Sequence, residues 1–164
     1  MRADHRHTPP AKGTIHLERR IAAPPETVFA YFTDPDRYRQ WQGTEAELDP
    51  RPGGTFRVRM TGRSGHVASG VFEEVEPPTR VLFTWGWEAG EALSEDQTSI
   101  APGASRVEVV LVPDGEGTIL RLRHSGLPSE SSCRFHDWGW DFSLDRLAVV
   151  TTGGDPGPNP YLDL

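Results

Sequence analysis

Several runs between Glu45 and Ser125 carry apolar side chains at every second position, which restricts this part of the chain to a β-rich fold. The clearest runs are Phe56, Val58 and Met60, then Val81, Phe83, Trp85 and Trp87, then Val107, Val109 and Leu111, then Leu120, Leu122 and His124. A period of two is typical of strands that bury one face. The connections TGRSG, EPPT and DGEG are short and turn-like, so we expect six strands that pair with their neighbours as an antiparallel meander.

Segments on either side of these strands predict helices. An earlier strand, TIHLERRI at residues 14–21, leads into PPETVF, whose prolines and glutamate suit the first turn of a helix. Pro35 ends that helix and opens a shorter one that ends near Trp41. Residues 129–152 contain no proline and predict one long helix. Residues 88–105 are acidic and lack a clear pattern, so we expect a mobile loop there.

The tripeptide WGW occurs twice, once in a predicted strand and once in the predicted long helix. Trp85 and Trp87 lie on one face, because side chains i and i+2 of a strand point the same way. Trp138 and Trp140 face nearly opposite sides of the helix, since two residues turn it by about 200°. The helix therefore carries two apolar stripes: the first stripe holds Cys133, His136, Trp140, Leu144 and Leu147, and the second stripe holds Phe135, Trp138, Phe142 and Val149.

A helix that is apolar on both sides needs more than a flat sheet to cover it. We therefore expect an α+β fold in which a strongly bent antiparallel sheet wraps around the long C-terminal helix and leaves a cavity beside it. Two short helices follow the first strand and close one end. Three covers for the second stripe stay open: the C-terminal tail around Tyr161, the acidic loop, or a second subunit in a homodimer.

Charge and composition exclude several classes of function. The chain has 24 acidic and 17 basic residues and a net charge of −7, which disfavours nucleic acid as a partner. It has one cysteine, Cys133, and no apolar run of membrane-spanning length, so we expect a cytoplasmic protein with no membrane partner. Residues 14–152 are expected to form one domain. Residues 1–13 and 153–164 are rich in proline, glycine and charge, and we expect flexible tails there.

Five segments in this order give the sequence a resemblance to a known superfamily. They are IHLERRIAAPPETVFAYFTDPDRYRQW, GGTFRVRM, GVFEEVEPPTRVLFTW, GTILRLRHSGLP and HDWGWDFSLDRLA, and they span most of residues 14–150. The chain resembles the START-like (SRPBCC) superfamily with its helix-grip, Bet v-like fold, and within it the bacterial proteins similar to the activator of heat-shock-protein-90 ATPase homologue. This resemblance implies a fold that in many members holds an apolar ligand between sheet and helix. A few members are enzymes, and others bind chaperones.

The candidate ligand-binding residues are those expected to face the concave side of the sheet. They are Trp41, Phe56, Phe83, Trp85, Trp87, His124, His136, Trp140 and Leu144. Large aromatic side chains are often plain core, but several indoles are hard to pack densely, and each buried Nε1–H needs an acceptor. A cavity that holds water or a ligand meets both needs. His124 and His136 are either satisfied core residues or a titratable pair in the pocket.

The sequence offers little for catalysis or cofactor binding. It contains no GxSxG, HExxH or CxxC pattern, so we expect no metal, no cofactor and no catalytic residue. Cys133 and His136 share a helix face, but a buried cysteine is more often structural. The leading expectation is a non-catalytic domain that binds a small, largely apolar or lipid-like molecule. The alternatives are a chaperone-binding activator module and a cyclase- or hydratase-like enzyme that uses His124 or His136 as a base.

Overall fold

The computed structural model of the protein describes residues 5–7, 13–89 and 93–164. Its elements in chain order are β1 (His5–His7), β2 (Thr14–Ile21), α1 (Pro25–Thr33), α2 (Pro35–Tyr38), β3 (Glu45–Leu48), β4 (Thr55–Arg59), β5 (Val67–Glu76), β6 (Arg80–Trp85), α3 (Glu95–Thr98), β7 (Ser105–Asp114), β8 (Gly117–Ser125), α4 (Glu130–Val150) and the 3-10 helix η1 (Pro160–Asp163). The expected order of a strand, two helices, six strands and a long helix is confirmed by β2 to α4. Three short elements, β1, α3 and η1, are additions to it.

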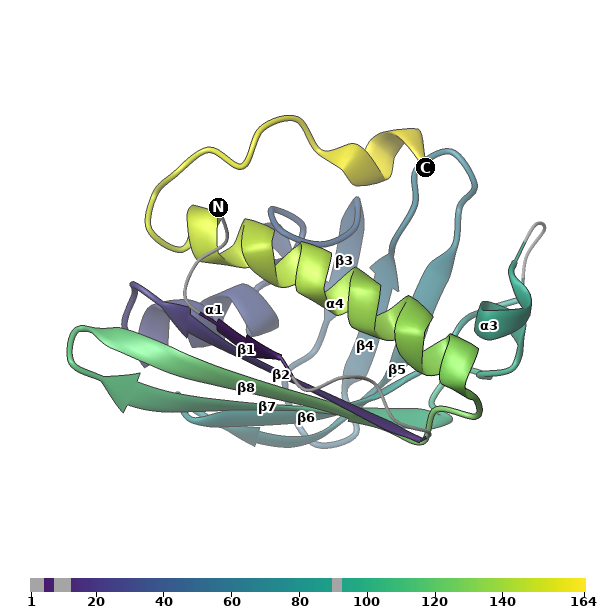
Figure 1. Ribbon diagram of the computed structural model, residues 1–164, viewed down its shortest axis with the longest axis horizontal. Helices are drawn as coiled ribbons and strands as arrows, with labels where there is room; N and C mark the ends of the chain where they lie inside the picture. Colours follow the sequence, from purple (N-terminus) through teal and green to yellow (C-terminus); the bar gives the residue numbers. More distant parts are fainter. Residues whose placement is uncertain (1–4, 8–12, 90–92) are drawn as a thin grey trace.

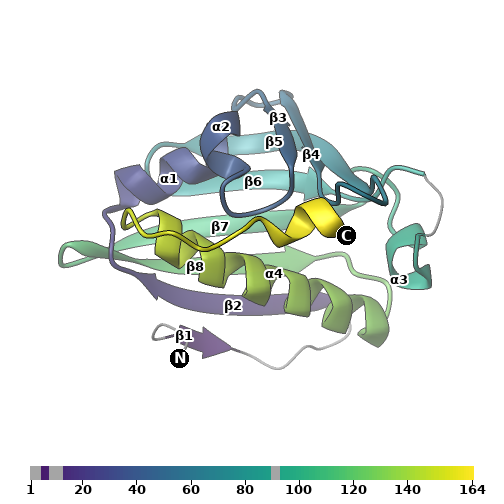
Figure 2. The same ribbon diagram turned by 90° about the horizontal axis from the view of Figure 1, so that it is seen from above.

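The strands form one antiparallel sheet in the order β1-β2-β8-β7-β6-β5-β4-β3. The six predicted strands pair in succession from β3 to β8, which confirms the meander. The first predicted strand, β2, joins this meander beside β8, with Leu17 opposite Leu122. Figures 1 and 2 show the sheet curving under α4, which lies across its concave face. The predicted helix-grip architecture is therefore confirmed.

The curvature of the sheet has a local cause in β5. The register between β5 and β6 shifts between Phe72 and Glu74, and such a bulge increases the local twist of a strand. Gly70 lies just before this shift, where a Cβ would overlap the carbonyl oxygen of Thr84. A glycine at this position lets the two strands approach closely at the bend. The sheet can therefore fold around α4 instead of lying flat beneath it.

The long helix begins where the sequence predicts. The hydroxyl of Ser129 accepts a hydrogen bond from the backbone N–H of Ser132 at 3.1 Å, which caps the first turn. All residues of the first stripe are buried against the sheet: Cys133, His136, Trp140, Leu144 and Leu147. The helix is also tied to β2 by Arg19, whose guanidinium contacts Asp141 at 2.8 Å and Asp145 at 2.7 Å.

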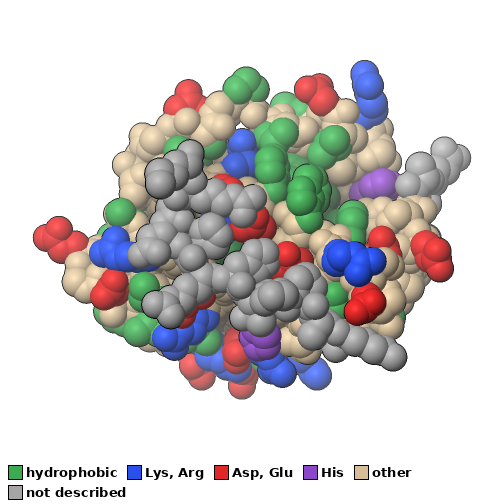
Figure 3. Space-filling view, viewed as in Figure 1, with side chains coloured by type: hydrophobic (Ala, Val, Ile, Leu, Met, Phe, Trp, Pro, Cys, Tyr) green, Lys and Arg blue, Asp and Glu red, His purple; other side chains and the backbone are tan. Residues whose placement is uncertain are grey.

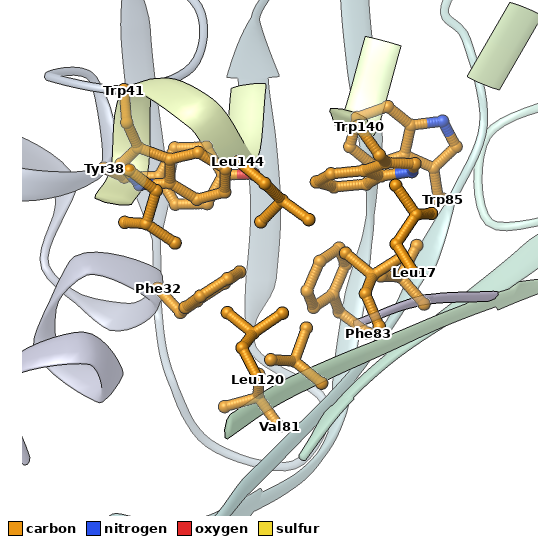
Figure 4. Packing of buried hydrophobic residues seen from close by; sticks show 14 of the residues in the cluster. Leu17, Phe32, Tyr38, Trp41, Val81, Phe83, Trp85, Leu120, Trp140 and Leu144 are labelled. Atoms are coloured by element: carbon orange, nitrogen blue, oxygen red, sulfur yellow. The ribbon is translucent and has the colours of Figure 1, made fainter. Parts of the chain in front are cut away.

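The core beneath α4 is closely packed at the end that α1 and α2 close. Phe32, Tyr38 and Trp41 meet there with ring centroids 4.7 to 6.4 Å apart. Figure 4 shows this group together with Leu144 at one end of the core and Trp85 with Trp140 at the other end. The two short helices thus seal one end of the space between sheet and helix, and any opening lies toward the tryptophans of the other end.

The C-terminal segment packs onto the molecule through η1. The Tyr161 ring is buried, and its hydroxyl lies 2.5 Å from Ser143 Oγ on α4. The backbone N–H of Gly62 donates to the carbonyl oxygen of Tyr161 at 2.8 Å, and that of Arg63 donates to Leu164 at 2.7 Å. Figure 2 shows the segment running alongside α4 on the β4 side. The C-terminal segment was one of the three covers considered for the second stripe. In the structure it does pack against α4.

Besides residues 153–164, which were expected to be a flexible tail and contain η1, two other regions predicted to lack structure contain short elements. In the N-terminal tail, β1 pairs antiparallel with β2, while residues 1–4 and 8–12 lie outside the described residues. In the acidic loop, α3 forms because the Ser94 side chain accepts from Gln97 N while the Gln97 side chain accepts from Ser94 N. The rest of the mobile-loop prediction falls partly on residues 90–92, which are not described. Within the described ranges, every helix is too short or too polar to cross a membrane.

Candidate functional site

A cavity of about 590 Å³ lies at the open end of the space under α4. It is bounded by α4, by the end of β6 and the residues after it, by the β4–β5 turn, by α3 and by η1. The lining consists of Gln42, Met60, Thr61, Ser64, His66, Trp85, Trp87, Gln97, Phe135, His136, Trp138, Gly139, Trp140, Phe142, Pro160, Tyr161 and Leu164. Aromatic rings from α4 and β6 make up much of this wall. The predicted cavity beside the long helix is present.

The structure divides the nine candidate residues into two groups. Trp85, Trp87, His136 and Trp140 line the cavity. The other five lie outside its lining, in the packed core: Trp41, Phe56, Phe83, His124 and Leu144. Close packing keeps them from the cavity: the rings of Phe56 and Phe83 stack with centroids 4.0 Å apart, and His124 lies behind Trp85 and Trp140, with centroids 5.9 and 6.2 Å from theirs. The concave face is therefore only partly hollow, and a residue that faces inward does not necessarily reach the cavity.

The two WGW copies have different roles, as their periodicity predicts. In the first copy, Trp85 and Trp87 are both buried and meet edge to face, with centroids 5.6 Å apart. In the second copy, Trp140 is 2% exposed whereas Trp138 is 64% exposed. The glycines differ as well. A Cβ at Gly86 would overlap the carbonyl oxygen of Ala101, whereas a Cβ at Gly139 would meet nothing within 4 Å.

The His136 ring donates one hydrogen bond and accepts another, and this pair of bonds requires the neutral form of the ring. Its Nδ1 lies 2.8 Å from the carbonyl oxygen of Ser132, which can only accept, so Nδ1 carries the proton. Its Nε2 accepts the indole N–H of Trp87 at 3.1 Å. Burial lowers the pKa of His136 to about 4, against an ordinary value of 6.5. At neutral pH this imidazole is therefore uncharged, and its lone pair is occupied.

His124 is arranged in the same way with the opposite tautomer. Its Nδ1 accepts the indole N–H of Trp140 at 3.1 Å, so the proton lies on Nε2, which contacts Ser105 Oγ at 2.8 Å. The Ser105 hydroxyl donates in turn to the carbonyl oxygen of Trp85 at 2.7 Å. Burial, reinforced by His136, lowers the pKa of His124 well below its ordinary value. The two imidazoles meet edge to face, with centroids 5.1 Å apart.

These hydrogen bonds decide what the histidines can do chemically. A general base needs a free lone pair within reach of the proton that it removes. In both rings the only lone pair receives an indole N–H, and protonation would place two donors against each other. The prediction of a pair of inward histidines is confirmed, and their bonding is that of satisfied core residues that serve as acceptors for Trp87 and Trp140.

Most of the lining was not among the candidate residues. Phe135, Trp138 and Phe142 belong to the second stripe, which signalled a covered surface but not a cavity wall. Gln42 follows α2, Gln97 lies in α3 and Gly139 lies in α4, and the other lining residues come from the β4–β5 turn and from the C-terminal segment. Apart from Met60, which continues the period of Phe56 and Val58, these two regions have no apolar period, so no sequence signal linked them to α4. They meet because η1 pairs with the turn, through Gly62 and Tyr161.

The edge of the cavity exposes apolar side chains. Trp138 stacks on Phe142 with centroids 5.8 Å apart, and Leu162 and Leu164 are more than half exposed nearby in η1 and just after it. Figure 3 shows hydrophobic side chains gathered on the face where α4 and the C-terminal segment lie. This surface adjoins the cavity lining, because Trp138, Phe142 and Leu164 belong to both. An apolar molecule that approaches here meets aromatic surface before it enters.

A second hollow of similar size has a different character. It measures about 620 Å³ and lies over β2, β7 and β8, with Glu18, Glu108, Arg121 and Arg123 in its lining. Arg121 donates to Glu18 at 2.9 Å across it, and Arg121 is largely exposed. Paired charges of this kind are typical of a solvated sheet exterior. The aromatic cavity under α4 is therefore the stronger candidate site.

A bent antiparallel sheet that grips a long C-terminal helix, with a cavity between the two, defines this chain as a START-like protein of the helix-grip fold. The chain belongs to the family described as Activator of Hsp90 ATPase homolog 1-like protein, whose family model matches residues 22–152. The resemblance read from the sequence is thereby confirmed. A comparison with curated proteins gave no match.

Solved structures of similar proteins support the same fold. An AHSA1-like protein of Rhizobium etli is 42% identical and has a TM-score of 0.68, with 96% of this chain and 92% of that chain covered. CalU16 of Micromonospora echinospora is 30% identical and has a TM-score of 0.65, with 93% and 85% covered. Protein CV1439 of Chromobacterium violaceum is 28% identical and has a TM-score of 0.71, with 85% and 96% covered.

Proposed function

We propose that this protein binds a small, largely apolar molecule in the cavity between the sheet and α4, and that it does so without catalysing a reaction on it. The observation that carries the proposal is the aromatic cavity of about 590 Å³, which falls in the size range of small-molecule sites. Its wall combines Trp85, Trp87 and Trp140 with rings of the second stripe. A wall of this kind favours apolar contact over the binding of ions.

The bonding of the histidines supports binding over the enzymatic alternative. Of the two histidines proposed as a base, only His136 lines the cavity, because His124 lies outside the lining. The Nε2 lone pair of His136 already accepts from Trp87, and burial lowers its pKa to about 4. Both features weaken the ring as a base at neutral pH. A chaperone partner, a homodimer and a cytoplasmic location stay predictions from the sequence.

Gly139 provides a direct test, because it lines the cavity and has room for a side chain. A leucine there would extend into open space instead of into the core. Replacing an interior helix glycine also raises helix stability by about 0.5–1 kcal/mol. Gly139→Leu should therefore unfold at a higher temperature than the wild type and yet bind a neutral apolar probe, fluorene, at least about tenfold more weakly.

The matched control is Gly139→Ala, which gives the same gain in helix propensity but fills little of the cavity. It should be stabilised in the same way and should keep fluorene binding close to that of the wild type. The measurements are thermal unfolding with and without fluorene, and titration followed by NMR. The proposal fails if fluorene, a long-chain fatty acid and a sterol all leave the wild type unshifted, or if Gly139→Leu binds as well as the wild type.

A further inference from the structure

The C-terminal segment, residues 154–164, forms one side of the cavity and yet buries little of itself. Pro160, Tyr161 and Leu164 belong to the cavity lining. Figure 2 shows the segment lying between α4 and β4. All of its residues are described, and Tyr161 is the only buried one, whereas Leu162 and Leu164 are more than half exposed. A segment with so little buried apolar surface gains little to offset the entropy of ordering it.

Main-chain hydrogen bonds hold the segment to the β4–β5 turn. The N–H of Gly62 donates to the Tyr161 oxygen at 2.8 Å, and those of Arg63 and Ser64 both donate to the Leu164 oxygen, at 2.7 and 2.9 Å. In the part of the chain that the structure describes, these three N–H groups have no other acceptor. Arg63 and Ser64 are exposed, so water can replace the segment as their acceptor without leaving a buried group unpaired.

Gly62 shows that the turn is fitted to this segment. A Cβ at Gly62 would lie 2.6 Å from the main-chain oxygen of Leu162 and 3.0 Å from its Cα, which is closer than packed atoms come. The turn itself does not require a glycine there, because the left-handed φ in this turn, +70°, belongs to Gly65 and not to Gly62. The close approach of the segment is therefore what requires Gly62.

The residues that connect the segment to α4 can act as a hinge. They include Gly153, Gly154 and Gly157, and the first and last of these have φ values of +81° and +86°. The N–H groups of Gly153 and Gly154 donate to the last carbonyl oxygens of α4, at 3.1 and 3.0 Å, so the helix keeps its own cap when the segment moves. Beyond this cap, Arg146 donates to the Pro156 oxygen at the long distance of 3.4 Å.

From these observations we infer that the C-terminal segment is a gate, which leaves Ser143 and the β4–β5 turn and so opens one side of the cavity to an apolar molecule. The inference rests on the proposed function and adds its regulation. A gate differs in its kinetics from a static wall. A wall adds contacts to the bound molecule and slows only its release, whereas a gate that has to open slows both entry and release.

The first measurement needs no ligand. The N–H groups of Gly62, Arg63 and Ser64 are protected through oxygens of the segment, so their hydrogen exchange reports its opening. In the wild type, NMR at increasing urea should show these three amides opening with a smaller free energy than the amides of β7, which open only by global unfolding. If the three amides exchange only together with those of β7, the segment does not open on its own and the inference is overturned.

The second measurement is stopped-flow binding of 1-aminoanthracene, a neutral apolar probe whose fluorescence increases in apolar surroundings. Gly62→Ala forces the segment from the turn, and Asn159→Ala removes its bonds to the Gly43 oxygen at 3.0 Å and to the N–H of Tyr161 at 2.9 Å. Neither Gly62 nor Asn159 lines the cavity. Since only the open fraction admits the probe, both variants should raise the association rate constant at least about fivefold, and the dissociation rate constant by at least as much.

The matched control is Arg63→Ala, which shortens an exposed side chain of the same turn and should leave both rate constants unchanged. Asn159→Ala acts from the side of the segment and covers the case in which Gly62→Ala disturbs the turn. A rise in the dissociation rate constant alone would identify a static wall and overturn the inference, while the proposed function stands because the probe binds. If the wild type binds neither fluorene nor 1-aminoanthracene, the proposed function fails and the gate with it.

Discussion

At the scale of single residues, His124 and His136 act as acceptors that allow two indoles to be buried. Each ring gives its lone pair to a tryptophan N–H, from Trp140 and Trp87 respectively, and uses its own proton elsewhere. The arrangement is stable only while the rings are neutral, because protonation would set a new N–H against the indole donor. Burial lowers the pKa of both histidines in accordance with this.

The lowered pKa of His136 predicts a loss of stability in mild acid. The unfolded chain binds a proton at this residue near pH 6.5, whereas the folded protein binds it near pH 4, so protons favour unfolding between these values. Stability is fully present above pH 6.5 and falls as the pH drops toward 4. Between pH 7 and pH 5, His136 alone should remove about 2 kcal/mol from the free energy of unfolding. Urea unfolding at the two pH values measures this.

The control for this prediction is His136→Gln, which keeps a donor and an acceptor but does not titrate in this range. Its free energy of unfolding should fall less between pH 7 and pH 5 than that of the wild type, and the remaining decrease reports mainly His124. An equal decrease in both proteins would show that His136 is not buried as a neutral ring.

Single residues also show which features of the core can be predicted from the sequence and which cannot. Periodicity alone placed Trp85 and Trp87 on one face and separated Trp138 from Trp140, because these directions follow from local backbone geometry. It did not reveal which acceptor each indole uses. The hydrogen bond from Trp140 to His124 joins α4 to β8. It depends on where the helix crosses the strand, and local sequence patterns do not determine that position.

At the scale of elements, Arg19 joins β2 to α4. It follows Ile15 and Leu17 in the inward series of its strand, and its side chain is fully buried. On α4 it meets Asp141, which is also buried, and Asp145, which is one-third exposed. This ion pair explains how an arginine occupies an inward position that the strand pattern reserves for apolar residues.

Removing only one partner of the Arg19–Asp141 ion pair should destabilise the protein. Arg19→Met leaves the buried Asp141 without the guanidinium and should lower the free energy of unfolding by about 3 kcal/mol. The double variant Arg19→Met/Asp141→Leu removes both charges and should recover most of the loss. Arg121→Met, at an exposed pair in the neighbouring strand, should change stability by less than about 0.5 kcal/mol. Urea unfolding of the three variants decides, and a mild effect of Arg19→Met would refute a linking role.

The predictability of elements depended on their length. Strands β4 to β8 and helix α4 have enough residues to show a period, and all of them were predicted. Helix α3 and η1 have four residues each, and side-chain caps support them: Ser94 with Gln97 in one case and Asn159 in the other. A four-residue segment shows no period, so capping groups of this kind are the main local signal for it.

At the scale of the whole molecule, the cavity arises because a rigid helix cannot contact a bent sheet along its full length. Its existence could be predicted from the two apolar stripes of α4. Its boundaries could not, because they depend on the contact between residues 61–64 and 161–164, which lie about 100 positions apart in the chain. The sealed end depends in the same way on the packing of α1 and α2, which buries Trp41 and leaves it no access to the cavity.

The central claim is that an apolar molecule enters this cavity, and a crystal structure with 2-bromofluorene tests it most directly. The bromine gives an anomalous signal that locates the probe without assumptions about its pose. The account predicts a bromine peak under α4, with the ring system against Trp85, Trp87 and Trp140. A cavity that contains only water while bromine occupies the outer face of the sheet, or a cavity that closes in the crystal, would contradict it.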